Sequence, residues 1–274
     1  MDKTKTKALG RWPNAPLAYL IAEIKFQRSQ DFDNALPQLI EQLADDFPLE
    51  ETTQTFEATI EPGQQQPTFE PVRDFKNFAS TMGVRITKGS FALHCTDYAG
   101  WSGGFEDTWT ALVKKVATTL RPRVLLRSSL RYIDLLVPED GESPDGMLAE
   151  GLRPWHSNGD GLGEFEQGNK AHRFKNGPYA TTLLVLSRVK GQIVLPPTVS
   201  AMPLVLSPPQ QNALKFHART SLAFAILDSD VVHEAATPFD LDQLKVQFTE
   251  LHRLTSTAFL AATSPEAQKR WQQA

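Results

Sequence analysis

The sequence predicts an α+β protein whose strands are largely antiparallel. Three observations lead to this fold class: alternating apolar and polar residues recur in short segments, helical periodicity is confined to a few segments between them, and no short repeat is present. Of the 274 residues, 41% are hydrophobic and 22% are charged, as in ordinary globular proteins. We therefore expect two largely antiparallel sheets, each covered by helices, with a long irregular connection between the halves.

The chain opens with a strand and a helix. In residues 17–26 one set of alternate side chains is apolar, whereas the other set includes Glu23 and Lys25, so the period is that of a strand. Residues 31–47 then carry leucines and other apolar side chains at helical spacing, and Pro48 stands where this helix should end.

A meander and a second helix complete the expected first half. Residues 52–60 alternate as a strand and lead into a loop rich in Pro, Gly and Gln. Two further strand segments follow, 72–81 and 84–98, and Gly89 either splits the second one or forms a bulge in it. Residues 100–120 have the amphipathic pattern of a helix.

The segment from 138 to 175 has many glycines, prolines and acidic residues and little periodicity, which is typical of a linker or a long insertion. This composition divides the chain. We expect an N-terminal sheet-plus-helix half of residues 14–140, a linker or insertion of residues 141–175, and a C-terminal sheet-plus-helix half of residues 176–274.

The C-terminal half begins with strand-like segments and ends in helices. The strand-like segments are 179–191, the proline-bounded stretch 193–209, and 221–232. Asp240, with Gln243 three residues later, predicts the start of a long helix, and Ser264 followed by Pro265 predicts a short one. The second half is therefore also a sheet with helices.

Composition narrows the classes of partner and compartment. The net charge of −4 provides no general attraction to phosphate backbones, so nucleic acid is not favoured. No apolar run approaches the roughly 20 residues of a membrane span, and no signal peptide is recognisable, so we expect a cytoplasmic protein with no membrane association. The single cysteine, Cys95, lies on an apolar strand face and is expected to be buried.

Two arginines stand in the strand of residues 123–137. Alternation places Arg127 and Arg131 on one face, with Tyr132 and Asp134 on the other. A buried arginine needs an acidic partner, which Glu23 or another neighbouring strand could supply. The favoured interpretation is a structural ion-pair network, and the alternative is an anion-binding site formed by Arg127 and Arg131.

Asp228 and Asp230 end the strand of residues 221–232 on a shared face. This spacing could hold a magnesium ion between two carboxylates, with His252 as an additional group. The favoured interpretation is that these carboxylates cap a turn or answer an arginine on the adjacent strand. His252 itself is expected to be a hydrogen-bonded histidine at the flank of the long helix.

The segment 98–109 is rich in glycine and aromatic residues and opens a helix. The best account is a tight turn that packs Tyr98 and Trp101, and any exposed part of this aromatic cluster would suit a protein partner. The chain lacks the common nucleotide, dinucleotide, hydrolase and redox signatures, so no cofactor is expected.

Five segments together resemble a sporadically distributed family of uncharacterised bacterial proteins. They are NAPLAYLIAEIKF, SFALHCTDYAGW, LRYIDLL, LDSD, and LH followed by Phe259 and Trp271, in the order of the family and across nearly the whole chain. Asp134 stands where the family pattern often has Asn. The resemblance implies no established activity or cofactor, and the patchy distribution of the family suggests an accessory role such as defence or toxin neutralisation.

Two hypotheses of function follow. The first is a non-enzymatic, macromolecule-binding protein of the bacterial cytoplasm, associated with immunity or defence, which recognises a protein partner with its sheet surface and aromatic turn through Arg127, Arg131, Tyr98 and Trp101. The second is a metal-dependent hydrolase or nuclease that uses Asp228 and Asp230. A small-molecule sensor with a ligand between the halves is a further alternative.

Overall fold

The computed structural model describes residues 12–28, 31–51, 56–59, 68–139, 142–154, 166–188, 193, 195–197, 202–220 and 223–273. The strands are β1 (Leu17–Phe26), β2 (Leu49–Glu51), β3 (Phe56–Thr59), β4 (Thr68–Pro71), β5 (Arg73–Lys76), β6 (Met82–Ile86), β7 (Ser90–Cys95), β8 (Val124–Leu136), β9 (Gln167–Asn176), β10 (Tyr179–Arg188), β11 (Phe224–His233) and β12 (Thr237–Pro238). The helices are α1 (Phe32–Leu43), α2 (Glu106–Leu120), α4 (Pro208–Thr220), α5 (Leu241–Ala262) and α6 (Pro265–Gln272), with short helical turns η1 (Trp101–Phe105), η2 (Pro144–Met147) and η3 (Glu150–Leu152).

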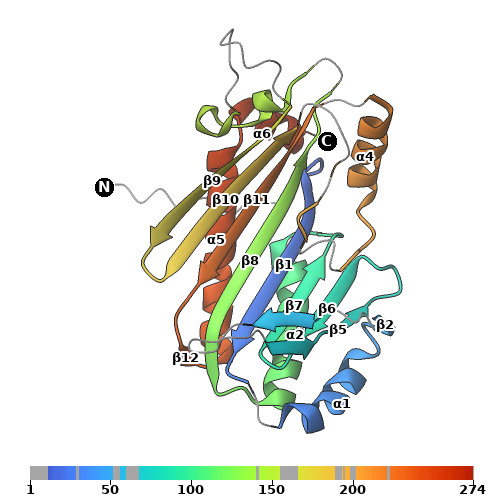
Figure 1. Cartoon of the computed structure of the whole chain (residues 1–274), viewed down its shortest axis with the longest axis vertical. Coiled ribbons are helices and arrows are strands. Elements are labelled where there is room, and N and C mark those ends of the chain that lie inside the picture. Colours follow the sequence, from blue (N-terminus) through green and yellow to red (C-terminus); the bar gives the residue numbers. More distant parts are fainter. Residues whose placement is uncertain are drawn as a thin grey trace.

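One large antiparallel sheet dominates the structure (Figure 1). Its strand order is β2-β5-β6-β7-β1-β8-β11-β10-β9, with β12 paired to β8, while β3 and β4 form a separate pair. The α+β class is confirmed, whereas two sheets that are each covered by helices are not, because the described strands lie mainly in one sheet. Strand β8 of the first half pairs with β11 of the second over the whole stretch from Leu136 opposite Ala225 to Ser128 opposite His233. The boundaries 14–140, 141–175 and 176–274 stay a prediction.

The segment expected to be irregular contains an edge strand. Strand β9 lies within the predicted linker and pairs with β10 from Gln167 to Asn176. Most of its side chains are exposed. Because an exposed edge strand buries no face, it has no apolar alternation by which the sequence could reveal it.

The proline-bounded stretch 193–209 was expected to be a strand, and its described residues are not in one. Prolines lack the N–H group that a sheet ladder requires, and here two of them, Pro208 and Pro209, begin helix α4. The other helix starts follow the sequence. Asp240 accepts a hydrogen bond from the Gln243 amide (2.8 Å), and Ser264 accepts one from the Ala267 amide (3.2 Å).

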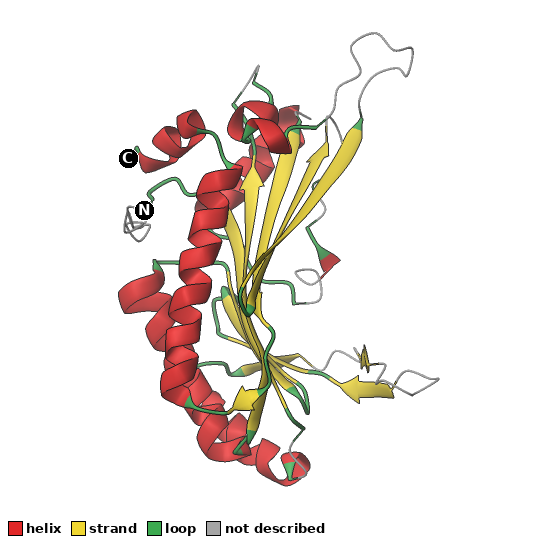
Figure 2. Cartoon of the chain, turned by 90° about the vertical axis from the view of Figure 1, so that its left-hand side faces the viewer, coloured by secondary structure: helices red, strands yellow, loops and turns green. Residues whose placement is uncertain are grey.

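The long helices gather on one side of the sheet (Figure 2). Helices α2 and α5 cover that face with an apolar layer in which Trp109, Val116 and Phe248 pack on strand residues such as Leu130. Within the described part of the chain, no helix has the length and apolar content that crossing a membrane requires.

The opposite face of the sheet has a smaller apolar cluster at one end. Tyr19, Ile133 and Ile226 belong to it, and the chain around Met202 lies over this region, because the Tyr19 hydroxyl donates to the Met202 carbonyl (2.8 Å). His94 is also buried here, with its Nδ1 3.1 Å from the Tyr19 hydroxyl. Beyond this cluster, the same face carries Arg127 and Arg131 of β8 and Asp228 and Asp230 of β11.

Candidate functional site

The two arginines of β8 lie on the face opposite the long helices, and each meets an aspartate of β11. Arg131 donates two hydrogen bonds to Asp228, from Nε to Oδ1 (2.8 Å) and from Nη2 to Oδ2 (2.5 Å). Arg127 forms a looser pair with Asp230 (3.6 Å). The predicted pairing of arginines with acidic neighbours is confirmed for these residues. Both guanidiniums already face carboxylates, which leaves less of their charge for an anionic ligand.

Glu23 was expected as an acidic partner of a buried arginine in β8, but in the structure it contacts other residues. Its carboxylate accepts a hydrogen bond from the Ser129 hydroxyl (3.5 Å) and lies 3.9 Å from the Lys25 ammonium. It therefore adds negative charge beside the two arginines, whereas the short bidentate contact to Arg131 belongs to Asp228.

The residues of the alternative metal site do not converge. Asp228 and Asp230 share a face of β11 with the arginines, whereas His252 on α5 lies against the other face of the sheet, where it contacts Tyr132. Among the described residues, no group of three or more His, Cys, Asp or Glu side chains could hold a metal ion. The spacing of Asp228 and Asp230 is thus accounted for by their arginine partners.

His252 belongs to an aromatic cluster with both residues of the predicted turn. The ring of Trp101 stacks on His252 with centroids 4.5 Å apart, and the His252 Nδ1 lies 2.9 Å from the Tyr132 hydroxyl. The Tyr98 hydroxyl is 3.4 Å from that of Tyr132. Trp101 is only 7% exposed, so it packs the turn and does not offer a surface contact.

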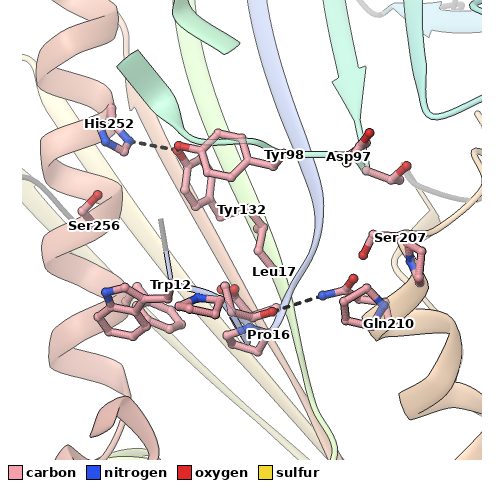
Figure 3. A pocket seen from close by; sticks show the side chains of 17 residues that line it. Trp12, Pro16, Leu17, Asp97, Tyr98, Tyr132, Ser207, Gln210, His252 and Ser256 are labelled. Atoms are coloured by element: carbon pink, nitrogen blue, oxygen red, sulfur yellow. Dashed lines mark hydrogen bonds between the residues drawn. The ribbon is translucent and has the colours of Figure 1, made fainter. Parts of the chain in front are cut away.

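Three members of this cluster, Tyr98, Tyr132 and His252, line a pocket of about 210 Å³. The pocket is lined by the segment that leads into β1, the loop after β7, strand β8, the first turn of α4 and the middle of α5. Figure 3 shows His252 and Ser256 of α5 on one side and, on the other, Ser207 just before α4 and Gln210 in its first turn, with Tyr98 and Tyr132 between them.

The pocket arises because β7 is shorter than its neighbour β1 and leaves the start of β1 unpaired by any described strand on that side. Strand β1 pairs with β8 from Leu17, but it pairs with β7 only from Leu20 onward. The chain leaves the sheet after Cys95, and α4 takes the place beside the start of β1 (Figure 1). Gln210 ties α4 to the segment before β1, because its Nε2 donates to the Ala15 carbonyl (3.1 Å).

The outer end of the pocket is aromatic. Trp12 contacts Phe259 edge-on with ring centroids 5.6 Å apart, and stacks on Trp271 of α6 at 6.5 Å. The backbone N–H of Asn14 donates to the Trp271 carbonyl (3.2 Å), and this bond holds the N-terminal segment against α6. These contacts position Trp12 at the pocket.

Three pocket-lining residues have buried oxygen atoms without a hydrogen-bond partner in the described part of the chain. They are Oδ2 of Asp134, Oε1 of Gln210 and Oγ of Ser256. Buried polar atoms normally have partners, and an unpaired one costs roughly 1–3 kcal/mol. Three residues of the pocket lining therefore have a side-chain oxygen whose hydrogen bonding the described chain leaves unsatisfied.

The buried and half-buried titratable groups of the pocket are held in their neutral forms at neutral pH. Burial, together with the nearby charge of Asp228, raises the pKa of Asp134 well above its usual range. Burial also lowers the pKa of His252 to about 4 and raises that of Tyr98 to about 12. The pKa of Tyr132 is raised as well, chiefly by its burial. These four groups of the wall are thus neutral hydrogen-bonding groups before any ligand enters.

Replacing Asp134 by Asn is expected to raise the stability of the protein more at pH 7 than at pH 5. The folded state holds a proton on Asp134 that the unfolded chain releases, so wild-type stability falls as pH rises above the ordinary carboxyl range, by up to about 1.4 kcal/mol per pH unit. The amide does not titrate. Urea unfolding of both proteins at the two pH values measures the difference, with the exposed Asp107→Asn as the control. A stability difference that does not change with pH would contradict a neutral Asp134.

Sequence reasoning found some of these residues and missed others. Tyr98 and His252 line the pocket, although they were selected for different roles, whereas Trp12, Gln210 and Ser256 were not selected. Asp134 was noticed only as a departure from a family pattern. The sequence does contain an indication that Asp134 is special, because a carboxyl group on the same strand face as Leu130 and Leu136 is unusual.

Comparison of the chain with protein-family models, with curated proteins and with solved structures finds no match.

Proposed function

We propose that this chain is a non-enzymatic binding protein that receives a chemical group of its partner in the pocket around Asp134. The observation that carries the proposal is the set of three unpaired oxygen atoms, from Asp134, Gln210 and Ser256, in the wall of one concave site. A ligand with hydrogen-bond donors would satisfy these atoms while its apolar part contacts the aromatic side chains, as in most ligand sites. The bacterial, cytoplasmic and defence-associated setting comes from the sequence alone.

The chemistry of the pocket supports binding in preference to catalysis. General acid–base catalysis works best when the pKa of the catalytic group is near the pH of the reaction. Here the pKa of His252 is about 4 and that of Tyr98 about 12, each displaced by burial. Cys95 is the last residue of β7. Burial raises the pKa of its thiol to about 12, so little reactive thiolate forms at neutral pH.

Filling the pocket tests the proposal. Wild-type protein and the Ser256→Phe variant are equilibrated with the same clarified extract of the native host, repurified and analysed by native mass spectrometry. We expect the wild type to carry a stoichiometric small molecule or polypeptide that Ser256→Phe lacks, because the phenyl ring occupies the space beside His252. The ligand should keep its mass after hours with the protein.

The matched control is Thr257→Phe, which places the same ring on the next, exposed residue of α5. Equal ligand occupancy in wild type and Ser256→Phe would refute the pocket as the site. Conversion of the ligand to a product over many turnovers would refute a purely binding role.

A further inference from the structure

The unpaired atoms of the pocket are all oxygens that can accept hydrogen bonds. Gln210 already donates through Nε2 to the Ala15 carbonyl, so its Oε1 is left as an acceptor. Oδ2 of the Asp134 carboxyl accepts, and the Ser256 hydroxyl can accept as well as donate. A ligand that matches this wall must bring several donors.

The described lining has acidic side chains with no Lys or Arg beside them, and Asp134, which is neutral before a ligand binds, ionises when a cation binds next to it. Two of its residues are aspartates, the buried Asp134 and the exposed Asp97, and among the lining residues that the structure describes none is Lys or Arg. A carboxylate that stays unpaired inside a protein is costly, whereas one that meets a cation forms a strong charge-assisted hydrogen bond. The pocket therefore favours a cation and disfavours an anion.

The remaining lining side chains suit the same ligand. The aromatic rings of Trp12, Tyr98 and Tyr132 line the pocket, and aromatic faces attract ammonium groups within about 6 Å of the ring centre. Phe259 adds an apolar surface for the carbon part of a ligand.

Resting on the proposed function, we infer that the group held by the pocket is an organic primary ammonium, whose N–H groups donate to Asp134 and Ser256 while its carbon chain packs on the aromatic wall. The same chemistry has two sources: a free organic amine, or the side chain of a lysine on a polypeptide partner.

Titration calorimetry of the full chain with a matched probe series tests this inference. The probes are phenethylammonium, its neutral isostere 2-phenylethanol, the N,N,N-trimethyl derivative, which keeps the charge but has no N–H donor, and the anion 3-phenylpropanoate. We expect phenethylammonium to bind with a dissociation constant below about 1 mM, and the other three to bind at least about tenfold more weakly, because each lacks the charge, the donors or both.

Two small substitutions locate the binding. Asp134→Asn keeps the shape of the side chain and should weaken phenethylammonium at least about tenfold while changing 2-phenylethanol less than about twofold. Ser256→Ala removes one hydrogen-bond acceptor and should lower the affinity for phenethylammonium about threefold. If Asp134→Asn does not fold, this variant tests on its own whether the ammonium binds in the pocket. The exposed Asp107→Asn is the control and should leave all affinities unchanged.

The failures of the two proposals are distinguishable. If 2-phenylethanol binds as tightly as the ammonium and Ser256→Phe abolishes both, the pocket binds ligands but the ammonium inference is wrong. The inference also falls if the trimethyl derivative binds equally well, if no probe binds, or if Asp134→Asn and Ser256→Ala leave the ammonium affinity unchanged. Binding of phenethylammonium that survives Ser256→Phe would refute the pocket itself.

A second pair of probes separates the two sources. Pentylammonium represents a free amine, and Nα-acetyl-lysine N-methylamide presents the same carbon chain on a peptide backbone. Equal affinity for both indicates that the pocket admits a lysine of a polypeptide, whereas binding of pentylammonium alone indicates a free amine. Binding of neither contradicts the ammonium inference.

Discussion

Replacing Arg131 by Ala is expected to lower the free energy of unfolding by about 3 kcal/mol, because it strands a buried carboxylate. Asp228 is only 4% exposed, and Arg131 is its bidentate partner. Burial alone would lower the pKa of Arg131, but the hydrogen bond and charge of Asp228 raise it overall, so the guanidinium stays charged. Denaturant unfolding at pH 7 measures the loss.

The control for this prediction is an ion pair of similar geometry on the surface. Arg253 also makes a bidentate contact, with Glu250 on the exposed side of α5, and Arg253→Ala should cost less than about 1 kcal/mol. The double variant Arg131→Met with Asp228→Leu should recover most of the stability, since it leaves no buried charge. If Arg131→Ala is as mild as Arg253→Ala, the pair is not structural, and the anion-binding alternative for Arg127 and Arg131 gains support.

Acidification is expected to unfold the protein between pH 6.5 and 4 through two buried histidines. Burial lowers the pKa of His94 from 6.5 to about 3, with a smaller contribution from the charge of Arg85, and burial lowers that of His252 from 6.5 to about 4. Each imidazole is neutral in the folded protein, while the unfolded chain takes up a proton below pH 6.5. The contribution of these two histidines to stability is therefore complete above pH 6.5, and at pH 4 each histidine has cost about 3 kcal/mol.

Urea unfolding across this pH range measures the effect, and substitutions identify its source. His94→Gln and His252→Gln should each flatten the acid limb of the stability profile by about one proton, whereas His172→Gln, on the exposed strand β9, should leave it unchanged. A profile that keeps its slope in both buried variants would show that other groups cause the acid unfolding.

Local patterns predicted most elements because each depends on neighbours in the chain. The strand of β1, the split at Gly89 between β6 and β7, and the caps of α5 and α6 follow from alternation, glycine and capping residues. The elements that sequence analysis missed, β9 and α4, lack such signals, because β9 buries little and α4 begins in a stretch that resembles a strand.

The candidate site was harder to predict, because its walls come from distant parts of the chain. Trp12, Asp134, Gln210 and Ser256 are brought together by strand pairing and by the early departure of β7 from the sheet. No residue spacing within a single segment predicts that these four residues lie in the same pocket. The one local indication was a carboxyl on an apolar strand face.

The sequence by itself determined the α+β class, the antiparallel character of most strands, the burial of Cys95 and the need of the β8 arginines for acidic partners. Each of these follows from periodicity or from the cost of burying an unpaired charge. Only the tertiary structure decided that the strands share one sheet, that Asp228 and Asp230 supply those partners, and that a buried carboxyl lines a pocket. Such facts depend on which segments pair across the sheet, and pairing is set by packing between residues far apart in sequence.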